Sequence, residues 1–155
     1  MKDISELYKD LDKLNLNLEK ELKVALEKTA NKIEKDARSL APGTGGYKSS
    51  IHKTSIKGNG SELSISVVTN VMTPVAKSNG KNYNLGFLLE NGTKPHIILP
   101  IDANVLHFQI NGEDIFARIV HHPGFTAREH FKPALNKSKN LQKREIAKAI
   151  KRAMK

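Results

Sequence analysis

Two short segments of the chain combine histidines and acidic groups with turn-forming residues. The first is residues 90–96, ENGTKPH, and the second is residues 121–128, HHPGFTAR. Four of the six histidines lie in or between these segments. Imidazoles near carboxylates are the side chains of zinc sites and of acid–base catalysis. The segments are therefore either part of a metal site or the structural corners of a small sheet protein.

A zinc site requires three or four converging ligands, each oriented by a second hydrogen bond. The side chains of the right type are His96, His107, His121 and His122, with Glu90 or Asp102. Their spacing matches no His-Glu-x-x-His motif, and adjacent histidines on a strand point to opposite faces. The chain has no cysteine, which excludes thiolate ligands and disulfides. We therefore expect turn or edge histidines, with no metal and no cofactor.

No pair of residues has the pattern of a catalytic site. Ser49 and Ser50 lack the Gly-x-Ser-x-Gly context of a hydrolase nucleophile. Glu90 follows an apolar run and has two interpretations: an inter-subunit salt bridge or base, or a charge at the end of a helix or strand. The second is slightly favoured. The sequence predicts that the protein is not an enzyme.

The glycine-rich segment 41–46, APGTGG, is similar in composition to a phosphate-binding loop. Such a loop needs a preceding strand and a Gly-Lys-Ser/Thr ending before a helix. Here a helix is predicted before the segment and a strand after it. The proline and glycines are better explained as the end of the helix.

Apolar residues recur at spacings of three and four from residue 4 to residue 40, which predicts an amphipathic helix. Asn15 and Asn17 have poor helix propensity and predict a short first helix and a long second one, bent between them. The helix has two interpretations: a coiled-coil or partner-binding arm, or a helix packed on the protein's own sheet. Small residues in its later part favour the sheet.

Alternating apolar residues predict a hairpin of residues 50–57 and 62–72. Residues 73–84 predict an exposed loop that becomes ordered on assembly, and residues 85–90 are either a strand or a two-turn helix. Further strands are predicted at 97–99, 105–108 and 115–120, with Asn111-Gly112 as a hairpin turn.

These elements predict an α+β fold: a small, mostly antiparallel β-sheet packed against a long N-terminal amphipathic helix, with a short middle helix or strand and a C-terminal helix. A length of 155 residues predicts a single domain over residues 1–155. It comprises a helical region 1–40, a β-rich core 41–125 and a basic helix 126–155 with a frayed end. Only 38% of residues are hydrophobic and 5% aromatic, so we expect a modest core completed by partners.

The net charge of +10 is concentrated at the C-terminus, where residues 126–155 carry ten basic and two acidic groups. Such a segment attracts nucleic acid or acidic surfaces. No apolar run is long enough to span a membrane, and no export signal is apparent, so we expect no membrane association. The basic residues of the predicted helix, most simply a solvated face, are Lys137, Lys139, Lys143, Arg144, Lys148, Lys151 and Arg152.

Four motifs follow one another along the chain: APGTG with KSSI, then ENGT, then PGFTAR, then KPAL. This ordered set resembles the head-tail joining and tail-completion (neck) protein family of long-tailed, siphovirus-type bacteriophages, over residues 20–140. The motif residues, which are also interface candidates, are Pro42, Thr44, Gly45, Ser50, Glu90, Gly92, Thr93, Pro123, Gly124, Arg128 and Pro133.

The chain departs from the family pattern in two places. Gly46 and Tyr47 replace the usual basic residue after Thr-Gly, and Glu129 and His130 stand where the family has Pro-Phe. A proline there would fix how the last helix begins, and this chain lacks it.

The resemblance implies a virion structural protein at the phage neck, which connects the capsid portal complex to the tail by docking into a ring. Its partners would be connector, tail terminator or tube proteins and further copies of itself, with DNA passing through the channel. It would be made in the bacterial host cytoplasm, from a phage or prophage. Two alternatives remain open: a nucleic-acid-binding module that uses the basic helix, and a histidine-based metal-binding protein.

Overall fold

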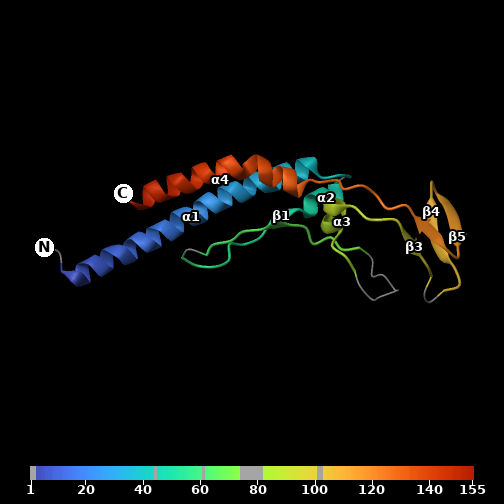
Figure 1. Ribbon diagram of the computed structural model, residues 1–155, viewed down its shortest axis with the longest axis horizontal. Helices are drawn as coiled ribbons and strands as arrows, with labels where there is room; N and C mark the ends of the chain where they lie inside the picture. The colour runs from blue at the N-terminus through green and yellow to red at the C-terminus, as the bar shows by residue number, and fades with distance from the viewer. Residues whose placement is uncertain (1–2, 44, 61, 74–81, 101–102) are drawn as a thin grey trace. The chain divides into compact units, whose positions relative to one another are not determined.

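The computed structural model describes residues 3–43, 45–60, 62–73, 82–100 and 103–155 (Figure 1). The chain divides into two compact units: unit 1 is residues 1–68 with 130–155, and unit 2 is residues 69–129. The fold is α+β, with a long N-terminal helix, small antiparallel sheets and a C-terminal helix, as the sequence predicts. That residues 1–155 fold as one domain stays a prediction.

Unit 1 is built on two antiparallel helices, α1 (Ile4–Leu40) and α4 (Phe131–Ala153), which lie side by side (Figure 1). Small side chains at the contact let the backbones approach closely. The buried alanines of the two helices are Ala25, Ala30, Ala37, Ala134, Ala149 and Ala153. The expectation that α1 packs on a sheet was incomplete: β1 and β2 do contact it, but α4 is its main partner.

The break predicted within the first helix is wrong, because α1 runs without interruption through Asn15 and Asn17. The two asparagines cost at most about 0.7 kcal/mol each, which a 37-residue helix tolerates. The frayed end predicted for the C-terminal helix stays a prediction. α4 remains helical to Ala153, which is buried, and Arg152 on its last turn pairs with Glu21 at 3.3 Å.

A short helix, α2 (Gly45–Ser50), follows the glycine-rich segment, where a strand was predicted. Only then does β1 (His52–Lys53) pair antiparallel with β2 (Val67–Val68), and an isolated bridge between Lys57 and Ser64 extends the pairing. The predicted hairpin is therefore confirmed, although its regular strands are only two residues long. The core beside it consists of Ile51 with Ala37, Ala41 and Ala134, surrounded by Ile33, Tyr47, Val67 and Phe131.

Unit 2 begins with the middle element, which is a helix, α3 (Leu85–Asn91), rather than a strand. The Asn84 side chain caps its start by accepting the Phe87 backbone N–H at 3.2 Å. The same side chain donates to the Thr69 carbonyl at 2.7 Å. Of the loop predicted over residues 73–84, residues 74–81 lie outside the described part of the chain.

Two antiparallel ladders follow in unit 2. β3 (His96–Ile98) pairs with β6 (Val120–His122), and β4 (Leu106–Ile110) pairs with β5 (Glu113–Ala117). The predicted hairpin turn is confirmed: Asn111 and Gly112 have φ values of 52° and 87°, as a tight two-residue turn requires. The single strand predicted at 115–120 is divided between β5 and β6, which belong to different ladders.

Candidate functional site

The two segments that combine histidines with turn residues are joined to each other in unit 2. Thr93 and Phe125 exchange both backbone hydrogen bonds, at 3.0 and 3.1 Å between N and O. The backbone N–H of Arg128 donates to the Leu89 carbonyl at 2.7 Å. Segments 90–93 and 123–128 therefore form one structure, which we call the crossing.

Each segment contributes a glycine that makes room for the backbone of the other. A Cβ atom on Gly92 would lie 2.6 Å from the Phe125 carbonyl oxygen, and one on Gly124 would lie 2.3 Å from the Thr93 carbonyl oxygen. Both glycines also have positive φ values, 73° and 74°, which other residues rarely adopt. Glycine is required at both motif positions, because two backbone segments of the chain approach each other closely there.

The histidines of these segments support the crossing. His96 and His122 are directly opposite on β3 and β6, and their rings stack with centroids 4.8 Å apart. The Gly124 N–H donates to His122 Nδ1 at 3.0 Å, and His96 Nδ1 donates to the Lys94 carbonyl at 2.9 Å. Within the described ranges, no group of three potential metal ligands comes together. The geometry makes this pair part of a structural corner.

His107 lies elsewhere in unit 2, on the β4–β5 hairpin. Its ring stacks on Phe116 with centroids 4.7 Å apart, and its Nε2 atom is 2.8 Å from Asp114 Oδ1. The Gln109 side chain also donates to Asp114, at 3.0 Å. The hydrogen bond from Gln109, followed by that from His107, lowers the pKa of Asp114 below its ordinary value. The hydrogen bonds from His107 and Gln109 to Asp114 therefore connect the two strands on one face of an exposed hairpin.

The other motif candidates of unit 2 lie at the ends of the crossing. Glu90 is half-buried in the last turn of α3, a position compatible with both of its interpretations, which stay predictions. Pro123 and Arg128 are exposed. Pro123 and Arg128 thus lie at the surface of unit 2, whereas Gly92 and Gly124 are placed by the close approach of the two backbone segments.

The first and last motifs meet in unit 1. Ala41 and Ile51 come from the first motif region and Ala134 from the last, and all three are buried in the same core cluster. Pro133 is half-buried in the first turn of α4, and Pro42 is half-buried just beyond α1. The remaining candidates are Gly45, which begins α2, Ser50, whose hydroxyl donates to the Tyr47 carbonyl at 2.6 Å, and Thr44, which lies outside the described residues.

The two departures from the family pattern contact each other. Tyr47 Oη lies 2.8 Å from Nε2 of His130, and the two rings meet edge to face with centroids 5.6 Å apart. His130 is fully buried directly before α4 and also packs on Phe131. The sequence held one indication of this contact, because Tyr47 and His130 each stand where the chain departs from the family's motifs. In place of a proline, a part-buried hydrogen bond to the buried His130 lies at the start of α4.

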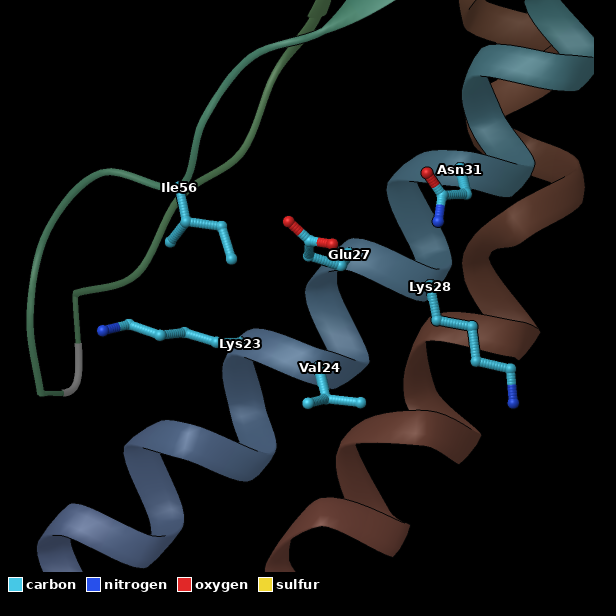
Figure 2. A pocket seen from close by; sticks show the side chains of 6 residues that line it. All are labelled: Lys23, Val24, Glu27, Lys28, Asn31 and Ile56. Atoms are coloured by element: carbon cyan, nitrogen blue, oxygen red, sulfur yellow. The ribbon is translucent and has the colours of Figure 1, made fainter.

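A groove of about 480 Å³ lies between α1 and the β1–β2 hairpin, with Val24 and Ile56 as its apolar residues (Figure 2). Its lysines already have partners. Lys23 pairs with Glu19 at 2.6 Å and Lys28 pairs with Glu145 at 2.9 Å. The groove therefore does not offer unpaired positive charge to an anionic ligand.

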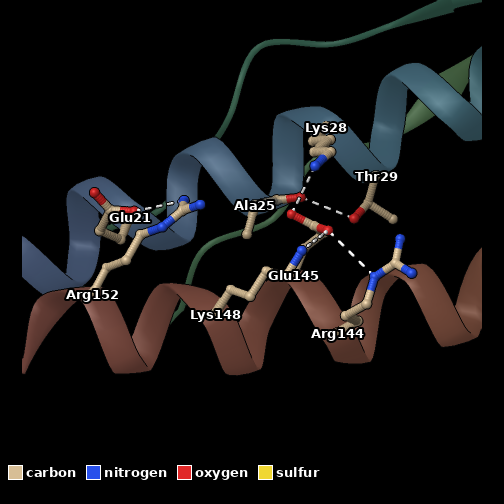
Figure 3. Close-up of polar contacts among 8 residues, drawn as sticks. All are labelled: Glu21, Ala25, Lys28, Thr29, Arg144, Glu145, Lys148 and Arg152. Atoms are coloured by element: carbon tan, nitrogen blue, oxygen red, sulfur yellow. Dashed lines mark hydrogen bonds and ion pairs between the residues drawn. The ribbon is translucent and has the colours of Figure 1, made fainter.

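No motif or spacing in the sequence selects Glu145 as a functional residue. It is the only acidic residue of α4 and its side chain is 5% exposed, at the contact with α1 (Figure 3). Its carboxylate accepts from Lys28 at 2.9 Å and from Lys148 at 3.4 Å, and Arg144 Nε lies 3.6 Å away. The hydrogen bond from Lys28 is the largest cause of a lowered pKa for Glu145, which burial opposes. One carboxylate thus offsets the basic charge of α4 where the two helices meet.

Replacing Glu145 with glutamine is expected to lower the thermal unfolding midpoint of unit 1 by a few degrees at neutral pH, because the charged contacts with Lys28 and Lys148 are lost. The folded-state pKa is lowered, so the carboxylate stabilises fully above the ordinary value of 4.5. That stabilisation disappears as the pH falls through the folded pKa.

Urea unfolding between pH 7 and pH 3 would measure this effect. The gap between wild type and Glu145→Gln should narrow below pH 4.5. The exposed residue Glu6 provides a control, because Glu6→Gln removes a carboxylate from α1 outside its contact with α4. A gap that stays constant over the whole pH range would contradict the assignment.

No helix among the described residues is long and apolar enough to cross a membrane. A comparison with protein-family models matches residues 5–92 to the HK97-gp10-like family, described as "Bacteriophage HK97-gp10, putative tail-component". The match covers more than half of the chain and includes the first motif and all but the last residue of the second. No curated protein and no solved structure matches the chain.

Proposed function

The chain belongs to the HK97-gp10-like family of bacteriophage tail components, and from that premise we propose that it joins the capsid to the tail at the neck of the virion. In this role it docks into a ring between the portal complex and the tail. Further copies of the chain complete the ring, beside connector, tail terminator or tube proteins. The family is one of structural tail components, and the proposal assigns the chain no catalysis.

The observation that carries the proposal is the missing core of unit 2. Among its described residues, none with a large apolar side chain is buried. Phe87 is 66% exposed, Phe116 65% and Ile97 58%. Apolar surface of this kind marks contacts with other proteins, which remove it from water. Unit 2 is therefore suited to a position between partner subunits.

Strand edges in unit 2 support the same position. Its regular strands form two-stranded ladders, so each described strand has a backbone edge that its ladder does not use. Such edges bind further strands from other chains. In the proposed ring, neighbouring subunits cover these edges and the apolar side chains beside them.

The crossing supplies the rigidity that docking requires. Its backbone hydrogen bonds join the end of α3, and the segment that leads from α3 to β3, to residues 123–128. We assign Gly92, Thr93 and Gly124 to this scaffold and the exposed Pro123 to partner contacts. In unit 1 we assign Pro42, Gly45, Ser50 and Pro133 to the segments at the end of α1 and the start of α4.

Deleting the gene from its phage is expected to yield DNA-filled heads and separate tails in electron micrographs of the lysate. A plasmid copy of the wild-type gene should restore joined particles. Phe116→Ser should fail to restore them, because it removes exposed apolar surface, whereas Gln109→Ser on the same face should succeed. Heat stability of both purified variants shows whether they fold.

Joined, infectious particles without the gene would overturn the proposal. They are also the result expected if the basic helix makes the chain an independent nucleic-acid-binding module. α4 carries eight basic residues against one acidic residue, and this composition is what favours that alternative. The absence of any tails would also overturn the proposal, since it indicates an earlier role in building the tail.

A further inference from the structure

The N-terminal part of α1 extends beyond its partner helix. Arg152, in the last turn of α4, pairs with Glu21 of α1, and Ala153 is the last buried residue of α4. On α1, residues 4–17 are all exposed, including Ile4 at 71% and Leu7 at 54%. We call residues 4–18 the overhang.

Apolar residues of the overhang follow a heptad pattern. Ile4, Leu7, Leu11, Leu14 and Leu18 have spacings of three, four, three and four, which form the seam of a coiled coil. The series continues through Leu22 to Ala25, which is buried at the contact with α4. The overhang thus continues the α4-binding face of α1 beyond the end of α4.

The seam reaches the helix pair beside two acidic residues, Glu19 and Glu21, and Glu21 pairs with Arg152. A hollow of about 610 Å³ lies where α4 ends, and its lining includes Leu18 and Leu22 from α1 and Ile146 and Ile150 from α4. The apolar surface therefore runs from the overhang to the last turns of α4. A helix that covers the overhang would lie in line with α4 and meet its end.

We propose that a second copy of the chain provides this helix, so that two overhangs pack antiparallel about a two-fold axis. In this arrangement Leu7 of each copy lies opposite Leu11 of the other, and Ile4 opposite Leu14. The added helix has the direction of α4, and its N-terminus faces the C-terminus of α4. The opposite ends of two helix dipoles then meet, which is favourable.

Charge favours a second copy over a strongly charged partner. The chain has a net charge of +10, yet residues 4–18 carry two basic and three acidic groups. Two overhangs can therefore meet without the repulsion that other surfaces of the chain would cause. A basic or acidic helix would find no matching excess of charge beside the seam.

The overhang is short, so the pairing is weak. Its 15 residues span about 21 Å as a helix, and the paired area lies at the small end of specific interfaces. The pair forms in the free protein at high concentration and separates on dilution. It is independent of the proposed neck function, and either can fail without the other.

Sedimentation equilibrium of the full-length protein tests the pairing over about 5 to 500 µM, a range chosen around micromolar dissociation. Wild type is expected to shift from monomer to dimer mass. Leu11→Lys buries a charge in the seam and should raise the dissociation constant about tenfold or more. Val24→Lys, at an exposed apolar position outside the seam, should leave it unchanged.

The antiparallel register has its own test. A mixture of Leu7→Glu and Leu11→Lys proteins should form mixed dimers, because the two new charges face each other only in this arrangement. Circular dichroism should show the same helix content in all variants, since the overhang is outside the core. A wild type that stays monomeric, an oligomer unaffected by Leu11→Lys, or a mixture that fails to pair would each overturn the proposal.

Discussion

Replacing Gly124 with alanine is expected to destabilise unit 2 by about 3 kcal/mol or more, from backbone strain and the loss of two hydrogen bonds. The new Cβ atom would lie 2.3 Å from the Thr93 carbonyl oxygen and 2.8 Å from the Lys94 carbonyl carbon. Both contacts are with backbone, so no side-chain rotation can relieve them. The Thr93–Phe125 pairing must open, and with it the crossing.

Hydrogen exchange of individual amides measures this opening. The Thr93 and Phe125 amides should lose protection in Gly124→Ala, while those of α1 and α4 keep theirs. Gly112→Ala is the matched control: its φ is also positive, at 87°, but nothing lies within 4 Å of the added Cβ. That control should cost only about 1 kcal/mol from strain. Equal effects of the two variants would show that the close approach is unimportant.

Replacing Ile51 with alanine is expected to destabilise unit 1 by about 2–5 kcal/mol, the range for a large-to-small change in a packed core. Ile51 is 0% exposed and is the largest side chain of its cluster. Its neighbours Ala37, Ala41 and Ala134 are too small to close the cavity by changing rotamer. The start of α4 should separate from the end of α1.

Chemical denaturation, followed by the helical signal of α1 and α4, measures this loss. Ile51→Val keeps most of the volume and should cost about 0.5–1.5 kcal/mol. Ile119→Ala removes the same atoms from a 54% exposed position and should cost about 0.5 kcal/mol or less. If Ile51→Ala lowered the free energy of unfolding no more than Ile119→Ala does, Ile51 would not belong to the core of unit 1.

The elements with strong local signals were predictable from the sequence. Apolar spacing identified α1, and Asn111-Gly112 identified the β4–β5 turn, because each signal depends on neighbouring residues only. The break predicted at Asn15 and Asn17 was wrong, because the low helix propensity of two asparagines is a small cost within a long, continuous helix. For residues 85–90, periodicity over so few positions could not separate helix from strand.

Features that depend on distant residues were not predictable in the same way. The motifs identified the segments of the crossing, but not that Gly92 and Gly124 each accommodate the other segment. The contact between Tyr47 and His130 joins positions 83 apart in sequence, and Glu145 is 117 residues from Lys28. Local patterns contain no record of such pairs. For the same reason, the prediction that α1 packs on a sheet did not identify α4 as its main partner.

The order in which the ribosome makes the chain gives the division into two units a further consequence. Unit 2 lies between the two parts of unit 1 in the sequence, so residues 69–129 leave the ribosome before α4 does. Until then the alanine-lined face of α1, which α4 covers in the complete fold, is exposed. Long-range contacts form late in folding and leave apolar surface open to other chains in the meantime. During synthesis, the face of α1 that α4 later covers is therefore open to contacts with other chains.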